Sequence, residues 1–348
     1  MRIPGKLSRL AVLPAALIVL ATALPAQDGL ISDQVVGYLP AVIRAGTGTT
    51  KTWTVLSLPL TITPGTQITG RITALTANTL TDAGADWSAG AWSTPAAPWF
   101  IRITSGASAG RSFLISTTTP NTATTLTLDE SGAADLTTLP IATGEEGDTF
   151  GILAAETLST LFPAGSGVLG GSDPDDSDVL QIIRSGISIT FYYDALAGHW
   201  IEAASGADAS DTVIPPDSAL LYGRLANTPI NLTLAGAVQG DDRRASVKSS
   251  GLTLLSNAWP VPVTLAESGI QSLPGWVSSS SPSSADQVQI HVSGVWKKYF
   301  HDGTRWRQAT LGNPVKDTEI IPAAAGVLIN RTGSAAGSVI LHQTAPYN

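Results

Sequence analysis

The feature that most constrains this chain is an internal repeat, because a repeated segment folds into a repeated unit. Residues 173–194 align with residues 281–302 at an offset of 108, with seven identities in 22 positions, including Asp178 with Asp286. After a two-residue difference in a turn the offset becomes 106, and residues 200–216 match residues 306–322 with seven identities in 17. The sequence therefore predicts two related units in one chain.

The repeat extends upstream, where residues 53–60 resemble residues 251–260. The second copy of this segment lies about 30 residues before Asp286, whereas about 120 residues separate the first copy from Asp178. We predict that a module is inserted in the first unit; the alternative is a plain string of three domains. The predicted parts are a first unit of residues 27–63 plus 153–238, an inserted module of residues 64–152, and a second unit of residues 239–348.

Alternation of apolar and polar side chains dominates the chain and predicts an all-β fold. Val288, Ile290 and Val292 alternate with polar side chains, and residues 187–193 show the same pattern. A period of two with one apolar side is typical of a half-buried strand. We expect each unit to be a β-sandwich of about seven strands. The inserted module has about six short strand signals and is expected to be a small closed β-barrel, because closure removes exposed edges.

Composition excludes several classes of protein. The chain contains no Cys, so it forms neither a disulfide scaffold nor a Cys-ligated metal site. Its formal net charge of −8 argues against a broad nucleic-acid interface, which needs positive charge. The hydrophobic fraction of 43% is enough to bury a core.

Residues 1–26 have the features of a secretory signal peptide. Basic Arg2, Lys6 and Arg9 precede an apolar stretch over residues 10–24, and small residues suit cleavage after residue 23 or residue 26. The alternative is an uncleaved N-terminal anchor. We expect a bacterial protein that is secreted, periplasmic or held at the cell surface, with no stable transmembrane span.

Short pieces spread along the chain carry a resemblance to a known group of proteins. They are Val36-Gly37-Tyr38, residues 57–60, residues 100–106 with Gly110-Arg111, residues 211–216, and residues 255–257 with Pro260. Together they resemble a paralogous family of secreted, β-rich bacterial proteins of uncharacterised function. The resemblance implies export, β structure and no assigned activity, and it carries no catalytic residues to this chain.

An acidic loop is the candidate metal site. Asp173, Asp175, Asp176 and Asp178 lie close together, and calcium prefers several hard oxygen ligands. The second copy has Ser at the first three of these positions, and only Asp286 matches Asp178. The four residues are therefore either a calcium site of the first copy or a solvated loop, and Asp178 and Asp286 are expected to have a structural role. No other cofactor is expected.

Aromatic residues supply the candidate ligand-binding sites. Trp200 and Trp306 follow the two equivalent hairpin turns, where exposed rings would form platforms for sugars; the alternative is that both are core anchors. Trp87 and Trp92 lie in a polar loop and form a second candidate. A dinucleotide-type glycine pattern at residues 165–170 is followed by loop residues rather than by a helix, which argues against nucleotide binding.

No catalytic motif is found, so we identify no catalytic residues and do not expect an enzyme. The favoured hypothesis is a non-catalytic exported protein with a structural, surface or adhesive role. A carbohydrate-binding protein with aromatic platforms is the alternative, and a polysaccharide-active enzyme is the third. The expected partner is a polysaccharide or protein of the cell envelope or extracellular matrix, with self-association through exposed strand edges as one version of this role.

Overall fold

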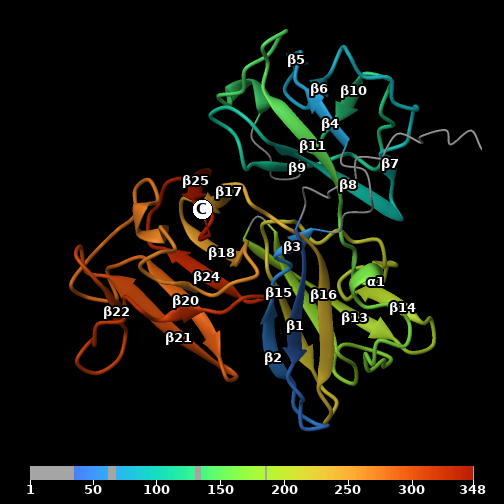
Figure 1. Cartoon of the computed structure of the whole chain (residues 1–348). Helices are drawn as coiled ribbons and strands as arrows, with labels where there is room; N and C mark the ends of the chain where they lie inside the picture. The colour runs from blue at the N-terminus through green and yellow to red at the C-terminus, as the bar shows by residue number, and fades with distance from the viewer. Residues whose placement is uncertain (1–34, 62–67, 130–134, 185, 348) are drawn as a thin grey trace, which may run out of the picture. The chain divides into compact units, whose positions relative to one another are not determined.

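The structure is a computed structural model that describes residues 35–61, 68–129, 135–184 and 186–347 (Figure 1). Regular structure in these residues is nearly all β, as the alternation predicts. The helices described there are α1 (Leu158–Leu161) and the 3-10 turns Leu136–Thr138 and Ile270–Ser272, and none of them could cross a membrane. The predicted signal peptide, residues 1–26, lies outside the described residues.

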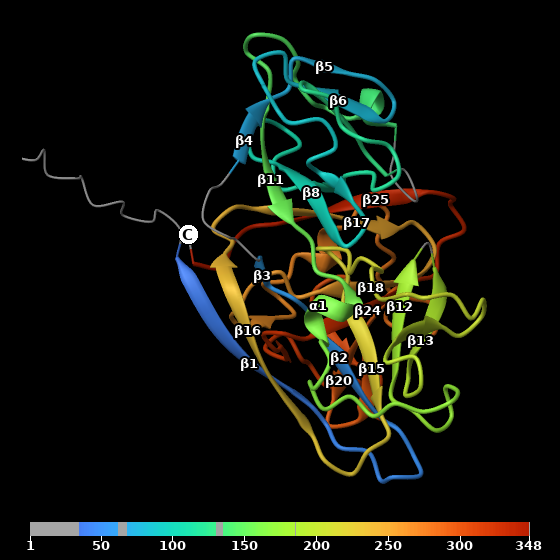
Figure 2. The same cartoon turned by 90° about the vertical axis from the view of Figure 1, so that its right-hand side faces the viewer.

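The first large sheet has five antiparallel strands in the order β14-β13-β12-β15-β2 (Figure 2). Their bounds are β14 (His199–Glu202), β13 (Ile187–Asp194), β12 (Val179–Arg184), β15 (Leu220–Arg224) and β2 (Thr52–Leu56). Alternate residues such as Leu180 and Ile182 are buried on one face, which is the burial pattern of a half-buried strand.

The second large sheet also has five antiparallel strands, in the order β22-β21-β20-β24-β18. Their bounds are β22 (Trp306–Gln308), β21 (Val295–His301), β20 (Gln287–Val292), β24 (Gly326–Arg331) and β18 (Gly251–Ser256). The strand order matches that of the first sheet, and so does the register. Tyr193 pairs with Trp200, and His301 pairs with Trp306, at the positions that the sequence alignment equates.

The two large sheets contact each other reciprocally. The Ser57 N–H donates to the Ala324 carbonyl at 2.9 Å, and the Ser256 N–H donates to the Asp217 carbonyl at 3.1 Å. Ser57 directly follows β2 and Ser256 ends the equivalent strand β18, and Asp217 and Ala324 precede the equivalent strands β15 and β24. Each sheet thus makes the same hydrogen bond to the other, as two surfaces related by a two-fold axis do.

Smaller sheets cover both large ones. The strand order β1-β16-β3 joins β1 (Val36–Ile43), β16 (Ile230–Val238) and β3 (Leu60–Thr61). β17 (Arg243–Lys248) pairs with β25 (Ser338–Gln343), and β19 (Val263–Thr264) pairs with β23 (Ile320–Ile321). Ile43 and Leu234 share a core with the first large sheet, and Val247 and Leu341 share one with the second.

The segment that was predicted to be a closed barrel contains open sheets instead. The barrel prediction is therefore wrong. One sheet has the order β4-β11-β8-β7 with β9 beside β8, and the other has the order β10-β6-β5. The bounds are β4 (Ile68–Arg71), β5 (Ala74–Leu75), β6 (Thr79–Thr81), β7 (Ser93–Thr94), β8 (Ala97–Ile103), β9 (Ser112–Leu114), β10 (Thr125–Thr127) and β11 (Thr149–Ala154).

The reason is the shortness of these strands. Closure needs a continuous ladder of strands long enough to tilt and stagger. In the described residues, the sheet of β5, β6 and β10 meets β9 through the isolated bridge between Ile115 and Leu128, and no ladder joins it to β4 or β7. The module instead buries Ile101, Leu126 and Phe150 in a core of its own between the two sheets.

Candidate functional site

Trp200 and Trp306 are buried, so they do not form exposed platforms, and the prediction of binding sites at these residues is corrected. Each ring is only 1% exposed. Trp200 packs at 5.6 Å from Tyr193, and Trp306 packs at 5.8 Å from Trp276, measured between ring centroids. Each Trp is the first inward-facing residue after its hairpin turn, and the large apolar surface of the ring is removed from water there.

Trp87 and Trp92 are half-buried and lean on the core of the middle segment. Trp87 meets Phe150 edge-to-face at a centroid separation of 6.3 Å, and Trp92 meets Trp99 in the same way at 4.9 Å. The Trp92 backbone N–H also donates to Asn121 Oδ1. These contacts fix the rings and leave part of each one accessible.

The acidic loop holds its carboxylates by its own backbone. Asp173 Oδ1 accepts hydrogen bonds from the Asp175 and Asp176 N–H groups at 2.7 and 3.3 Å, and Asp176 Oδ1 accepts from the Asp173 N–H at 3.0 Å. The backbone hydrogen bond from Asp173 lowers the pKa of Asp176. Among the described residues, no group of three or more His, Asp or Glu side chains is arranged to hold a metal ion.

Asp178 stands apart from that loop and is fully buried beside Arg224. Its oxygens also accept hydrogen bonds from the Leu225 N–H at 2.8 Å and from the Tyr222 hydroxyl at 2.8 Å. Burial, and then the negative charge of Asp178, raise the pKa of Tyr222. This carboxylate fastens the strand β15 to the loop before β12.

The second sheet repeats this arrangement. The Arg331 Nε donates to Asp286 Oδ2 at 2.6 Å, and Asp286 Oδ1 accepts from the Thr332 N–H at 2.7 Å. Asp286 is fully buried, like Asp178. The sequence analysis missed both arginines, although Arg224 and Arg331 each end the equivalent strand at an offset of 107.

One outer strand, β1, carries several exposed apolar side chains on the same face. Val36 is 56% exposed, Tyr38 is 74% exposed and Val42 is 53% exposed, and Pro40 is also exposed. β1 pairs with β16 on one side, and among the described residues no strand pairs with its other side (Figure 2). We call the free side of β1 from Val36 to Val42 the β1 edge.

The direction of the backbone groups at the β1 edge follows from one hydrogen bond. The Val238 N–H donates to the Val35 carbonyl at 2.8 Å, so odd-numbered residues of β1 bond toward β16. Successive peptide groups point to opposite sides of a strand, so Val36, Tyr38 and Val42 direct their N–H and C=O groups outward. The Arg44 N–H already donates to Thr54 Oγ1, so the β1 edge ends before Arg44.

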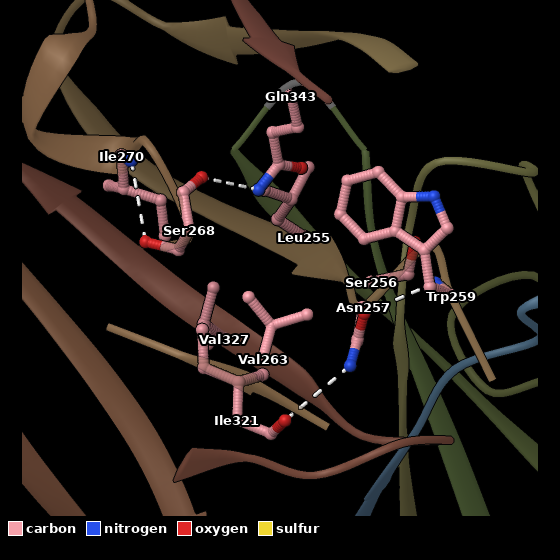
Figure 3. A pocket seen from close by; sticks show the side chains of 10 residues that line it. All are labelled: Leu255, Ser256, Asn257, Trp259, Val263, Ser268, Ile270, Ile321, Val327 and Gln343. Atoms are coloured by element: carbon pink, nitrogen blue, oxygen red, sulfur yellow. Dashed lines mark hydrogen bonds between the residues drawn. The ribbon is translucent and has the colours of Figure 1, made fainter. Parts of the chain in front are cut away.

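Two pockets among the described residues offer little to a ligand. The first lies in the core beside the second large sheet and has a cavity volume of only about 10 Å³ (Figure 3). Its amide side chains are satisfied: Gln343 Nε2 donates to the Ser268 carbonyl at 2.6 Å, and Asn257 Nδ2 donates to the Val261 carbonyl at 3.0 Å. A cavity of about 10 Å³ is far smaller than the roughly 300–1,000 Å³ of typical ligand sites.

The second pocket lies where β8, β17 and the loop before β15 meet, around about 380 Å³ of space that is partly open to solvent. Arg243 Nε forms an ion pair with Asp217 at 3.0 Å, and Arg102 donates to the Gln239 side chain. Burial lowers the pKa of Arg102. Both guanidinium groups therefore already have protein partners. Their contacts connect β8, β17 and the loop before β15.

Comparison with known proteins gives no relative. No family model matches the chain, and no curated protein or solved structure is similar to it. The resemblance to a paralogous secreted family therefore stays a prediction, and function has to be argued from the molecule itself.

Proposed function

We propose that this chain is a non-catalytic exported protein with a structural role at the cell surface, and that it is held to its partner through the β1 edge. One observation carries the proposal: in the part of the chain that the structure describes, β1 presents backbone groups with no strand beside them, together with exposed Val36, Tyr38 and Val42. A soluble protein normally protects such an edge with charge, a bulge or a covering loop, because it invites another strand. Addition of a strand to a free edge is a common mode of protein recognition.

The proposed architecture is a duplicated β-sandwich unit with an inserted module. The equal strand order of the two large sheets, their equal register and the repeated ion pairs Asp178–Arg224 and Asp286–Arg331 support the duplication. Equivalent bridges, Thr157 to Val213 and Thr264 to Ile320, follow the strands that end at Leu56 and Ser256. About a hundred residues precede Thr157 after its strand, against fewer than ten before Thr264, which supports an insertion.

A retention experiment tests the function. The purified protein is mixed with cell envelopes and with a panel of insoluble polysaccharides, beside the double variant Tyr38→Arg plus Val42→Lys. The proposal expects retention on envelopes that the double variant loses. Equal retention of both proteins would contradict a role for the β1 edge. Retention on one polysaccharide, whatever the residues at the edge, would favour the carbohydrate-binding alternative.

The control is Val295→Lys, which places a charge at a residue that is 61% exposed in another part of the fold. We expect this variant to be retained like the wild type.

A further inference from the structure

The chain contains its own comparison for the β1 edge, because β17 has the place of β1 beside the second large sheet. β1 precedes β2 and pairs with β16, and β17 precedes β18 and pairs with β25. The offset of 107 that relates Arg224 to Arg331 also relates buried Leu234 to buried Leu341. On the outer face, β17 carries Arg244, Ser246 and Lys248, where β1 carries Tyr38, Pro40 and Val42.

Burial supports this correspondence. Val247 and Ala245 are fully buried, and their counterparts Ala41 and Leu39 also face the core. The two strands therefore share an inner face and differ on the outer face, where β17 has charged or polar residues and β1 has apolar ones.

The edge of β17 is also covered. The Arg244 N–H donates to the Gly110 carbonyl at 3.1 Å, and the Arg244 guanidinium donates to the Ala109 carbonyl. A Cβ at Gly110 would lie 2.3 Å from the Asp242 carbonyl, so this approach is possible only because Gly110 has no side chain. The strand that is covered has Arg and Lys, and the strand that is open has Tyr and Val.

We propose that the partner of the β1 edge is the β1 edge of a second copy of this chain, paired antiparallel about a two-fold axis through Leu39. This inference rests on the proposed function and names its partner. The three-stranded sheet β1-β16-β3 would continue across the axis into the same sheet of the second copy.

The register follows from the outward groups. A two-fold axis at Leu39 sets Val36 opposite Val42 of the second copy and Tyr38 opposite Pro40. Val36 and Val42 have both an N–H and a carbonyl to exchange. Tyr38 donates its N–H to the Pro40 carbonyl, and Pro40, which has no N–H, leaves only one bond of that pair unmade. This pair occurs twice about the axis, so two bonds are unmade in all. A shift of the axis to Pro40 would leave the same number unmade at two facing prolines, and would also set Val36 opposite Arg44, whose N–H already donates to Thr54.

The side chains match in the same register. On the outer face, each Tyr38 ring lies beside Pro40 of the second copy, and each Val36 beside Val42. Aromatic and β-branched pairs opposite each other stabilise antiparallel strands.

The charge distribution permits a second copy as the partner at this face. The chain carries a net charge of −8, so copies repel each other over most of their surface. The outer face of β1 and β16 has no charged residue; its exposed members are Val36, Tyr38, Pro40, Val42, Asn231, Thr233 and Ala235. This face is where two acidic copies can meet without opposing charges.

The small contact area predicts a weak pair. One ladder between two short strands buries less than the roughly 1,200 Å² of a stable interface. We therefore expect a monomer–dimer equilibrium that depends on concentration, and an effect that grows when many copies are displayed together.

The first test is sedimentation of the purified protein over a range of concentrations. We expect the average mass to rise with concentration toward that of a dimer for the wild type and for Val295→Lys. The double variant Tyr38→Arg plus Val42→Lys should remain a monomer and keep its fold, because the outer face of β17 already carries Arg244 and Lys248. A monomeric wild type, or equal association of all three proteins, would overturn the proposal.

The second test reads the register and uses the absence of Cys in the chain. Val36→Cys and Val42→Cys are made separately and oxidised, each alone and mixed in equal amounts. We expect disulfide-linked dimers in the mixture and little in either single sample. Equal cross-linking of either variant alone would overturn the two-fold register.

The two proposals fail in different ways. If the wild type stays monomeric but is retained on envelopes, and the double variant is not retained, the partner is not a second copy and the proposed function stands. If the wild type pairs as expected but the wild type and the double variant are retained equally on envelopes, the pairing is supported and the proposed function is contradicted.

Discussion

One buried aspartate stabilises the same position in each of the two large sheets. Asp178 and Asp286 are fully buried, and each accepts hydrogen bonds from an Arg and from backbone N–H groups. Removal of one partner of a buried ion pair leaves the other charge without compensation.

Asp178→Ala should therefore lower the free energy of unfolding by about 3–5 kcal/mol, because Arg224 would stay buried without its carboxylate. Urea denaturation followed by circular dichroism measures the change. Asp175→Ala, in the same exposed loop, is the matched control and should change stability by less than about 0.5 kcal/mol. A similar loss in both variants would show that Asp178 has no special role.

Asp302 predicts a pH dependence of stability. The hydrogen bond from Arg307, followed by backbone N–H groups of the turn, holds the pKa of Asp302 well below its usual range. A carboxyl whose pKa is lower in the folded state stabilises the fold above its unfolded pKa of about 3.9, and this contribution is lost as the pH falls further.

The stability difference between the wild type and Arg307→Gln should thus be largest near neutral pH and should shrink below about pH 4. Thermal or urea unfolding at several pH values measures it. Lys298→Gln, on the neighbouring strand, should give a difference that changes little over the same range. A difference for Arg307→Gln that is independent of pH would contradict this account.

At the scale of elements, close approach of strands depends on residues without side chains. A Cβ at Gly236 in β16 would lie 2.3 Å from the carbonyl oxygen of Thr61 in β3. Gly240, four residues later, has no atom within 4 Å of an added Cβ.

Gly236→Ala should separate β3 from β16 and lower the free energy of unfolding by about 1–3 kcal/mol, a typical effect of overpacking. Gly240→Ala is the control and should have little effect. Urea denaturation of both variants measures the difference. If Gly236→Ala matches the wild type, β3 is not held as closely as the structure indicates.

The alternation of apolar and polar residues predicted where strands lie in the chain, but it did not predict which strands are exposed. Residues 187–193 and 288–292 are strands, as their period of two indicated. The same period does not say which strand lies at an edge. β1 has apolar residues at both parities, so its sequence alone does not separate a strand covered on both faces from one that is exposed on one.

At the scale of the whole molecule, the two large sheets and the middle segment have separate cores. Val55, Ala219 and Leu254 form a further cluster that joins the two large sheets. If the middle segment is an insertion, the two sheets should not need it to fold.

Replacement of residues 64–152 by a short linker of Gly and Ser tests this. The replacement leaves β3 and its buried Leu60 in place beside β16. We expect a folded β protein with one cooperative unfolding transition, seen by circular dichroism and thermal unfolding. A chain without such a transition would favour three domains that depend on one another.

The sequence by itself determined the all-β class and the repeat, because both are properties of local order along the chain: a period of two, and a fixed offset between matching residues. Tertiary structure decided which aromatic rings are buried and which carboxylates face an arginine. Trp200 and Trp87 both follow polar turns in the sequence, yet only the first enters a core. It also decided that Asp178 meets Arg224, 46 residues away, and that β17 is covered while β1 is open. Burial and partnership come from segments far apart in the chain, so no local pattern contains them.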